Sequence, residues 1–426
     1  MINRLRNSSI LLPTVVLLAA CSGESHKLDV PPTSEGISAP ENLSWFSRVA
    51  LDAYIRFSSW RGERSGYIVM FARDGMPIYS NAAGWKDIAS DAPMTVDTHV
   101  RIASMTKPVT AVTAMSLVEE GSLGLDDRVS EYLPEFAQLR VALNHVPGPN
   151  GEYETRAATE PLRVRHLLMF SSGIGPGMEE GNALNEHWGA YGIYEQDSGD
   201  LRSRVASLAQ LPLFEEPGTR WRYGYSADVL AAIIQVITGQ GIEVAMRERV
   251  FDPLGMSNTR YEPLPAQRAE MATIYTQDSE GELVVVPDRN HTGWNPGGSG
   301  LVSTAGDYMR FALMLWNGGE YQGERILQRG TIEEMRRPHM AQGVLASSDI
   351  EGLGWGLGMA VVADEEATVM PDRAGDFWWS GSYGTTFVVS PATGLVGVIY
   401  TQNKLSGFSG QPYQVYAVQG IVYGGL

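Results

Sequence analysis

Ser104-Met105-Thr106-Lys107 is the stretch from which the fold of this chain can be predicted outward. From Met105 to Glu120 the apolar residues recur at helical spacing, whereas His99 to Ala103 has the pattern of a short extended run. Ser104 is therefore predicted to lie where a strand passes into the first turn of a helix. Pro108 fits that turn, because the first N–H groups of a helix have no intrahelical partner.

The spacing of the serine and the lysine predicts a chemical role. Residues three apart share one face of a helix, so the Lys107 amine can reach the Ser104 hydroxyl. A hydroxyl is a weak nucleophile until a base takes its proton, and a desolvated, neutral lysine is such a base. The positive end of the helix dipole favours that neutral amine and stabilises a developing alkoxide. Ser-x-x-Lys alone is a weak signal, but its position at a helix start favours catalysis.

Composition excludes several classes of function. The chain has 426 residues, of which 43% are hydrophobic and 9% aromatic, as in a folded protein with a large core. Its formal net charge of −17 argues against nucleic acid, which needs clustered Lys and Arg. The seven histidines form no ligand motif, so neither a metal site nor a cofactor is expected. Gly-x-Ser-x-Gly is absent, which argues against a nucleophile elbow.

The N-terminus has the features of an export signal. Two arginines precede a short apolar run, Ile10 to Ala20, which is followed by Cys21. Cys21 is the only cysteine, so no intramolecular disulfide can form. An ordinary secretory signal with an incidental cysteine is the alternative to a lipoprotein signal.

Leu18-Ala19-Ala20-Cys21 resembles the bacterial lipobox, whose cysteine is lipid-modified. This resemblance implies a signal peptide over 1–20 and a lipid-anchored Cys21 on an exported protein that faces the periplasm. Ser22 after the cysteine favours the outer membrane of a Gram-negative cell. Residues 21–41 are polar and rich in Pro, Ser and Gly, which predicts a flexible tether.

The remaining residues, 42–426, are predicted to form one domain with strands at both ends and helices between them. Asp74-Gly75 is a hairpin signal between two apolar runs. The pattern predicts an α/β fold of the α+β sandwich type, in which an antiparallel sheet is flanked by N- and C-terminal helices and interrupted by a helical insertion at about 124–297. The individual elements expected are helices over 43–57, 105–120, 164–170, 201–210, 227–238 and 412–423, and strands over 66–72, 76–80, 377–379, 385–390 and 395–400.

A loop over 217–226 opens into the helix predicted at 227–238 and contains Tyr223 and Tyr225. Tyrosines at such positions are usually packed aromatic residues. A tyrosine beside Arg or Lys can instead act as a general base. From the residues alone, both tyrosines are candidates for that role.

The segment 377–385 contains two glycines at the edge of a strand. Glycine lets a substrate approach backbone N–H groups closely, as an oxyanion hole or an added strand requires. The alternative is an ordinary glycine-rich turn between two strands.

These segments together resemble the serine β-lactamase and penicillin-recognising superfamily, most closely its family VIII carboxylesterases and class C β-lactamases. The resemblance implies a β-lactamase/transpeptidase-like fold and an acyl-enzyme formed on Ser104, with Lys107 and a tyrosine sharing the proton transfers. The matching segments are 101–111, 164–173, 217–230 and 251–256, with 298–307 beyond them.

The resemblance also implies roles for individual residues. It places the catalytic tyrosine at Tyr223, and it places the family's strand motif at Trp379-Ser380-Gly381, which lies against the substrate. The oxyanion hole would be the backbone N–H groups of Ser104 and Ser382. In this sequence Tyr225 replaces the asparagine that binds the antibiotic's amide, and Trp379 replaces the cation that faces a β-lactam carboxylate.

The two replacements favour an ester over a β-lactam, because a charge-assisted contact to a carboxylate contributes about 1.5–3 kcal/mol. We therefore expect a serine hydrolase that cleaves small carboxylic esters. A β-lactamase or DD-peptidase, an acyltransferase, and a penicillin-binding sensor that is acylated without turnover are the alternatives.

Overall fold

A computed structural model of the chain describes residues 33–34, 43–177, 181–191, 193–194, 199–288, 293–340, 351–368, 371–404 and 412–426. The predicted signal peptide, Cys21 and most of the predicted tether lie outside the described residues. From the tether only β1 (Thr33–Ser34) is described, and it pairs with β3 (Met76–Asp87).

Both ends of the chain contribute to one antiparallel sheet, as predicted. The sheet has nine strands in the described residues, in the order β1-β3-β2-β17-β16-β15-β14-β13, with β4 paired to β3. The strands from the two ends of the chain meet where β17 pairs with β2, for example at Tyr400 and Ile68. The other strands of the sheet are β2 (Gly66–Arg73), β4 (Ala92–Pro93), β13 (Leu353–Trp355), β14 (Ala360–Val362), β15 (Phe377–Gly381), β16 (Thr385–Ser390) and β17 (Leu395–Tyr400).

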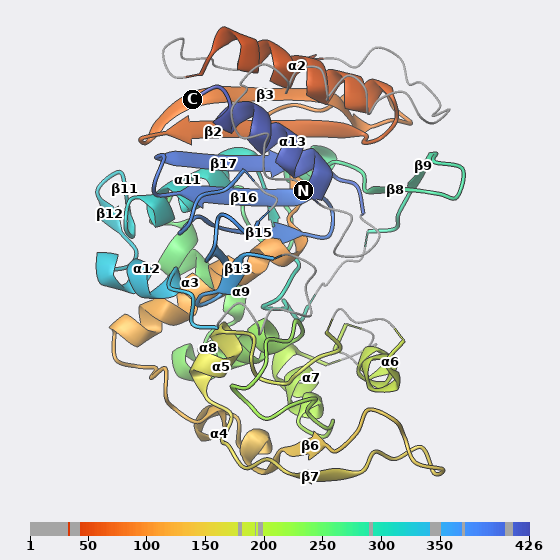
Figure 1. Cartoon of the computed structure of the whole chain (residues 1–426), viewed down its shortest axis with the longest axis vertical. Helices are drawn as coiled ribbons and strands as arrows, with labels where there is room; N and C mark the ends of the chain where they lie inside the picture. Colours follow the sequence, from red (N-terminus) through yellow and green to blue (C-terminus); the bar gives the residue numbers. More distant parts are fainter. Residues whose placement is uncertain are drawn as a thin grey trace.

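The central strands are buried along their whole length because helices cover both faces of the sheet. Every residue of β16 and β17 is buried, which explains the nearly continuous apolar sequence of β17. The helix α2 (Trp45–Trp60) packs on β3 and on α13 (Pro412–Tyr423), while α11 (Ala305–Trp316) packs on β16 and β17. Figure 1 shows α2 as the outermost layer and α13 crossing the sheet.

The segment between the two halves of the sheet is mainly helical and lies at the other end of the molecule (Figure 1). Its α8 (Ser226–Thr238) packs against α3 (Thr106–Glu119); α3 is almost entirely buried, and α8 is buried from Ser226 to Ile234. The other α-helices are short, with four to eight residues each: α4 (Val129–Tyr132), α5 (Val164–Leu168), α6 (Ala183–Ala190), α7 (Leu201–Leu208), α9 (Ile242–Met246), α10 (Pro265–Ala269) and α12 (Arg329–Met335). Short two-stranded pairs join β6 (Arg140–Ala142) to β7 (Thr155–Ala157), β8 (Tyr275–Gln277) to β9 (Leu283–Val285), and β5 (Val100–Arg101) to β10 (Val302–Ser303).

Several element boundaries predicted from the sequence were wrong, among them the helices predicted at 43–57 and 201–210, which are Trp45–Trp60 and Leu201–Leu208. The extended run at 99–103 is a strand only at Val100–Arg101, because the backbone turns at Ala103 with a φ of +46°. The strand predicted at 76–80 continues to Asp87, where it pairs with β4. The helix predicted at 164–170 ends at Leu168.

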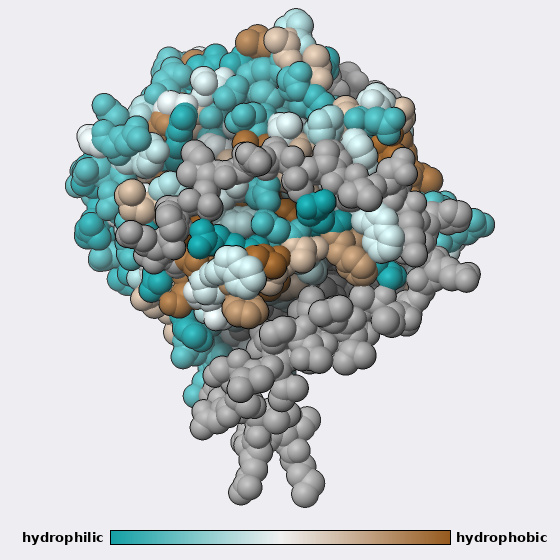
Figure 2. Space-filling view, turned by 90° about the horizontal axis from the view of Figure 1, so that it is seen from above, coloured by the Kyte–Doolittle hydropathy of each residue, from teal (hydrophilic) through white to brown (hydrophobic). Residues whose placement is uncertain are grey.

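The described surface in Figure 2, seen from the end that carries α2, is mostly hydrophilic, with hydrophobic residues in small groups. Among the described residues no single helix combines the length and apolar character needed to cross a membrane. The segments Ser226–Thr238 and Ile242–Phe251 meet the criterion only together, with a bend of 82° between them.

Candidate active site

Ser104 lies in a tight turn between strand β5 and helix α3. The turn is the 3₁₀ helix η2 (Ala103–Met105), and Ser104 is half-buried within it. The positive φ of +46° at Ala103 is uncommon for a residue with a side chain, and such strain often accompanies functional sites. Two contacts hold the turn: Thr106 Oγ1 donates to the Ala103 carbonyl at 2.8 Å, and Met105 N–H donates to the Ile102 carbonyl at 3.0 Å.

Lys107 reaches Ser104 from the first turn of α3, as the three-residue spacing predicted. Its Nζ donates to Ser104 Oγ at 3.1 Å and to the Gly298 carbonyl at 2.7 Å. The amine also lies over the Tyr223 ring, 4.7 Å from its centroid. With only 6% of its surface exposed, Lys107 is largely removed from water.

Tyr223 is a second hydrogen-bond donor to Ser104 Oγ. Its hydroxyl donates to Ser104 Oγ at 2.8 Å. The ring is stacked on Phe170 at 5.7 Å between centroids and packs against Trp379 at 5.6 Å. The side chain is therefore fixed by aromatic contacts on more than one side.

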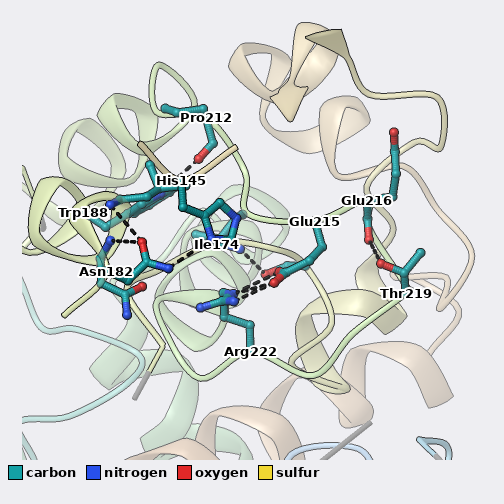
Figure 3. A network of polar contacts seen from close by, with 12 residues as sticks. His145, Ile174, Asn182, Trp188, Pro212, Glu215, Glu216, Thr219 and Arg222 are labelled. Carbon is teal, nitrogen blue, oxygen red and sulfur yellow. Dashed lines mark hydrogen bonds and ion pairs between the residues drawn. The ribbon is translucent and has the colours of Figure 1, made fainter. Parts of the chain in front are cut away.

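The loop that carries Tyr223 is braced by a buried ion pair at the preceding residue (Figure 3). Arg222 and Glu215 form hydrogen bonds at 2.5 to 3.2 Å, and the guanidinium lies 3.8 Å from the centroid of the Phe214 ring. The Arg222 N–H donates to the Phe170 carbonyl at 2.6 Å. These contacts fix the backbone on one side of Tyr223.

Tyr225, the other candidate tyrosine, has different neighbours. Its ring lies 5.9 Å from that of Tyr194 and 6.1 Å from that of Trp188. Of the two tyrosines, Tyr223 is thus the one whose hydroxyl donates to Ser104.

The strand motif Trp379-Ser380-Gly381 ends β15 beside the Ser104 turn. A Cβ at position 381 would lie only 2.2 Å from the Ile102 carbonyl oxygen, so glycine is required for this close approach. Thr385 Oγ1 donates to the same carbonyl at 3.0 Å. Ser382, which follows the motif, is exposed.

Trp379 is buried, with 2% of its surface exposed, and its ring packs at 4.7 Å against that of Trp355. Ser380 is also buried, with 5% exposed. Trp379 therefore contributes to the aromatic support of Tyr223, and its side chain is less open to a substrate than the sequence led us to expect.

Asp228, Gly298 and Tyr194 extend the site beyond the residues singled out from the sequence. Asp228 Oδ1 accepts the Gly298 N–H at 2.9 Å, and the Tyr194 hydroxyl donates to the same oxygen at 3.2 Å. A Cβ at position 298 would lie 3.0 Å from Asp228 Oδ2 and 3.3 Å from Lys107 Nζ, so a larger residue would crowd the network. Asp228 and Lys107 are thus connected through the Gly298 peptide.

Burial raises the pKa of Asp228 from 3.8 to about 6, although the positive charge of Lys107 opposes this shift. Desolvation disfavours the carboxylate, while an opposite charge favours it. The carboxylate lies at the first turn of α8, where the helix dipole also favours a negative charge. Asp228 can therefore serve as a buried counter-charge to an ammonium at Lys107.

Together the described residues provide a nucleophile with two proton-transfer partners and a buried counter-charge. Within the same residues, no group of three or more His, Cys, Asp or Glu side chains is arranged to hold a metal ion. The arrangement can perform acyl transfer through side-chain chemistry on Ser104.

Asp228→Asn is expected to change the pH dependence of activity. Because its pKa is raised to about 6, Asp228 is a carboxylate above that pH and takes up a proton as the pH falls through it. Loss of the charge removes the stabilisation of an ammonium at Lys107, so kcat/KM of the wild type should fall on the acid side of about pH 6. The variant should be about 10²-fold less active at pH 8. Its kcat/KM should not show the decrease below about pH 6.

The measurement is a pH profile of kcat/KM from pH 4.5 to 9, with Asp97→Asn, a change at an exposed carboxylate, as the control. An acid limb that remains near pH 6 in the Asp228 variant would show that another group causes it.

Comparisons with known proteins show the family to which this chain belongs. The family model described as Beta-lactamase matches residues 51–417. Protein Rv1367c of Mycobacterium tuberculosis (strain ATCC 25618 / H37Rv) is 32% identical over 79% of this chain and 85% of its own length. Esterase EstB of Burkholderia gladioli is 29% identical over 81% of this chain and 88% of its own length.

A solved structure has the same fold. It is described as EstCE1, a hydrolase with promiscuous acyltransferase activity, and it has a TM-score of 0.75 and 26% identity over 88% of this chain and 98% of its own. The fold is therefore the β-lactamase/transpeptidase fold expected from the sequence. The chain belongs to the beta-lactamase family and is an enzyme of the serine hydrolase type.

Proposed function

We propose that the protein is a carboxylesterase that cleaves small, neutral esters through an acyl-enzyme on Ser104. The observation that carries the proposal is the convergence of Lys107 Nζ at 3.1 Å and the Tyr223 hydroxyl at 2.8 Å on Ser104 Oγ. A nucleophile within hydrogen-bond reach of its base is the arrangement that covalent catalysis requires.

In the acylation step Ser104 Oγ attacks the ester carbonyl carbon, and its proton leaves along one of these two contacts. Lys107 and Tyr223, whose ring centroid lies 4.7 Å from the Lys107 amine, then pass that proton to the departing alcohol oxygen. The backbone N–H groups of Ser104 and Ser382 donate hydrogen bonds to the carbonyl oxygen and stabilise the negative charge that develops on it. Water then attacks the acyl-enzyme by the reverse sequence of proton transfers and releases the acid.

The ester preference rests on the absence of a cation at the strand motif. At the position where the superfamily has a cation, this chain has the buried, neutral Trp379. A β-lactam carboxylate would lose a charge-assisted contact there, which lowers transition-state stabilisation by about 1.5–3 kcal/mol, or roughly 10- to 150-fold. A neutral ester has no carboxylate and loses nothing. The similarity to esterase EstB supports the same substrate class.

Acyl transfer to a second alcohol is the other activity that a specific observation favours. EstCE1, which shares the fold, is described as having promiscuous acyltransferase activity. Transfer uses the same acyl-enzyme, with an alcohol in place of water in the second step.

A substrate panel tests the esterase proposal. We expect kcat/KM for p-nitrophenyl acetate or butyrate to exceed that for a chromogenic cephalosporin by about tenfold or more. Added short alcohols would reveal transfer as a new ester product detected by chromatography. A preference for the cephalosporin would identify a β-lactamase, and a single burst of product without turnover would identify a sensor.

A further inference from the structure

Helix α2 exposes a row of large apolar side chains on the side that faces away from the sheet. These side chains are Trp45, Phe46, Val49 and Phe57, with exposed fractions of 65%, 76%, 45% and 43%. They recur at helical spacing, with the exposed Ala53 between Val49 and Phe57, and so lie along one face, the outer face of α2. The buried Leu51 and Ile55 lie on the opposite face. Because α2 is the outermost layer of the molecule, its outer face borders solvent (Figure 1).

Aromatic side chains stand in pairs at the two ends of the outer face. The rings of Trp45 and Phe46 are 5.2 Å apart, and those of Phe57 and Trp60 are 5.6 Å apart. Val49 lies between the two pairs. Single exposed apolar residues are ordinary on protein surfaces, whereas a contiguous row of them marks an interaction site.

The charges of α2 are arranged so that its outer face is positive. Arg56 is exposed on this face. Asp52, the only acidic residue of the helix, is held toward strand β3, because its Oδ1 accepts hydrogen bonds from the Tyr79 hydroxyl and the Asn81 amide, both at 2.7 Å. The outer face therefore has a cation and no carboxylate, although the chain as a whole has a net charge of −17. Such a face is complementary to an anionic partner.

The outer face is too small for a stable protein interface but large enough for a lipid surface. The helix has 16 residues, which at about 1.5 Å per residue gives a strip about 24 Å long and roughly 10 Å wide. Each partner of a stable protein pair usually buries about 800 Å², several times the area of this strip. An amphipathic helix in a bilayer interface, in contrast, needs only one apolar face.

We propose that the outer face of α2 docks in the headgroup region of an anionic phospholipid bilayer. Helices that lie in this region bury an apolar face about 5–10 Å deep, and tryptophan prefers the boundary between headgroups and acyl chains. Trp45 and Phe46 enter this boundary, while Arg56 keeps its guanidinium at the lipid phosphates.

The position of α2 in the chain and in the fold supports this partner. Cys21, the predicted site of lipid attachment, lies 24 residues before Trp45. A lipid there would hold α2 near the bilayer and so favour a second, weaker contact. Three strands, β2, β17 and β16, lie between β3, on which α2 packs, and β15, which reaches the active site. Docking through α2 would therefore orient the enzyme with its active site away from the lipid.

Fluorescent labels at two sites of the unlipidated full-length chain test the proposal. Cys21→Ser removes the only cysteine, and Val49→Cys or Val236→Cys then supplies a single site for the environment-sensitive fluorophore nitrobenzoxadiazole. Val236 is the matched control, because it is a valine with 44% exposure on α8, in the helical segment at the other end of the molecule (Figure 1). With vesicles of phosphatidylglycerol and phosphatidylethanolamine, we expect brighter, blue-shifted emission from position 49 that nitroxide-labelled lipid quenches, and no change at position 236.

The comparison of the two sites separates docking from tethering. Attachment of the chain through its N-terminal segment alone would leave both labels in water, and attachment through the other end of the molecule would shift the label at position 236 instead. Either result would overturn the proposal. A label at position 49 that is shielded before vesicles are added, on a chain that sediments as a dimer, would assign the outer face to a second copy of the chain and would equally overturn it.

Substitutions on the outer face should weaken docking and leave the fold intact. Trp45→Ala combined with Phe46→Ala should raise the lipid concentration for a half-maximal response at position 49 by about tenfold or more, since both rings leave the interface. Arg56→Gln should raise it about threefold to fivefold on the anionic vesicles. Leu143→Ala combined with Val146→Ala, at side chains exposed by 51% and 69% between β6 and β7, is the control and should change neither the response nor thermal unfolding. Undiminished docking of the Trp45 and Phe46 double variant would contradict the assignment to the outer face.

Discussion

Ser104→Ala is expected to lower kcat/KM for a short-chain p-nitrophenyl ester by about 10⁴- to 10⁶-fold, the loss typical of removing a nucleophile. The hydroxyl is the one group on which Lys107 and Tyr223 converge, so no acyl-enzyme can form without it. Alanine fits the turn because Ser104 is only half-buried and its hydroxyl is not needed to hold the 3₁₀ turn. Intact-mass spectrometry after treatment with a fluorophosphonate should find the wild type modified once and the variant unmodified.

Ser90→Ala, at an exposed serine between β3 and β4, is the matched control and should keep full activity and labelling. Thermal unfolding of both variants should match that of the wild type, since neither change removes buried apolar surface. If the Ser104 variant keeps more than a few per cent of wild-type activity, another residue is the nucleophile.

The Ser104–Lys107 contact could be predicted because it depends on local geometry alone. Three residues on one helical turn bring two side chains to the same face whatever the rest of the chain does. The hairpin at Asp74-Gly75 and the strands over 385–390 and 395–400 are likewise local patterns, of turn residues and apolar runs, and the structure has them at the predicted places.

Asp228 and Gly298 could not be assigned roles in the same way. They are 70 residues apart, and their hydrogen bond exists only because the Gly298 segment packs against the first turn of α8. Neither segment has a sequence pattern that predicts this contact. A carboxylate in the first turn of an otherwise apolar helix was the available signal, since a charged residue is seldom buried unless it has a partner.

The edge of the sheet and the position of Trp379 also depend on tertiary structure. Strands β13 and β14 have three residues each, too few for a period of two to be recognised. Trp379 could be placed on a strand, but its burial against Trp355 follows from how β13 lies in the sheet. The sequence therefore predicts the motif, whereas the direction of its side chain follows from the assembled sheet.

Tyr223→Phe is expected to lower kcat by about 10²- to 10⁴-fold, the range for a positioned acid or base. The change removes only the hydroxyl that donates to Ser104 Oγ at 2.8 Å. The ring would keep its packing against Phe170 and Trp379, so the protein should unfold at nearly the wild-type temperature. Steady-state kinetics with p-nitrophenyl butyrate measure the effect, and a smaller change in KM than in kcat is expected because the hydroxyl acts on the reacting atoms.

Tyr225→Phe is the matched control, since it removes the same atom from the same loop two residues later. Its ring packs against Tyr194 and Trp188, and it is Tyr223 that donates to Ser104, so we expect less than about a tenfold loss of kcat. The reverse ranking would assign the proton transfer to Tyr225 and would mean that the loop rearranges when substrate binds. Equal, small losses in the two variants would mean that neither tyrosine transfers the proton. Lys107, whose amine contacts Ser104 Oγ, would then be the base.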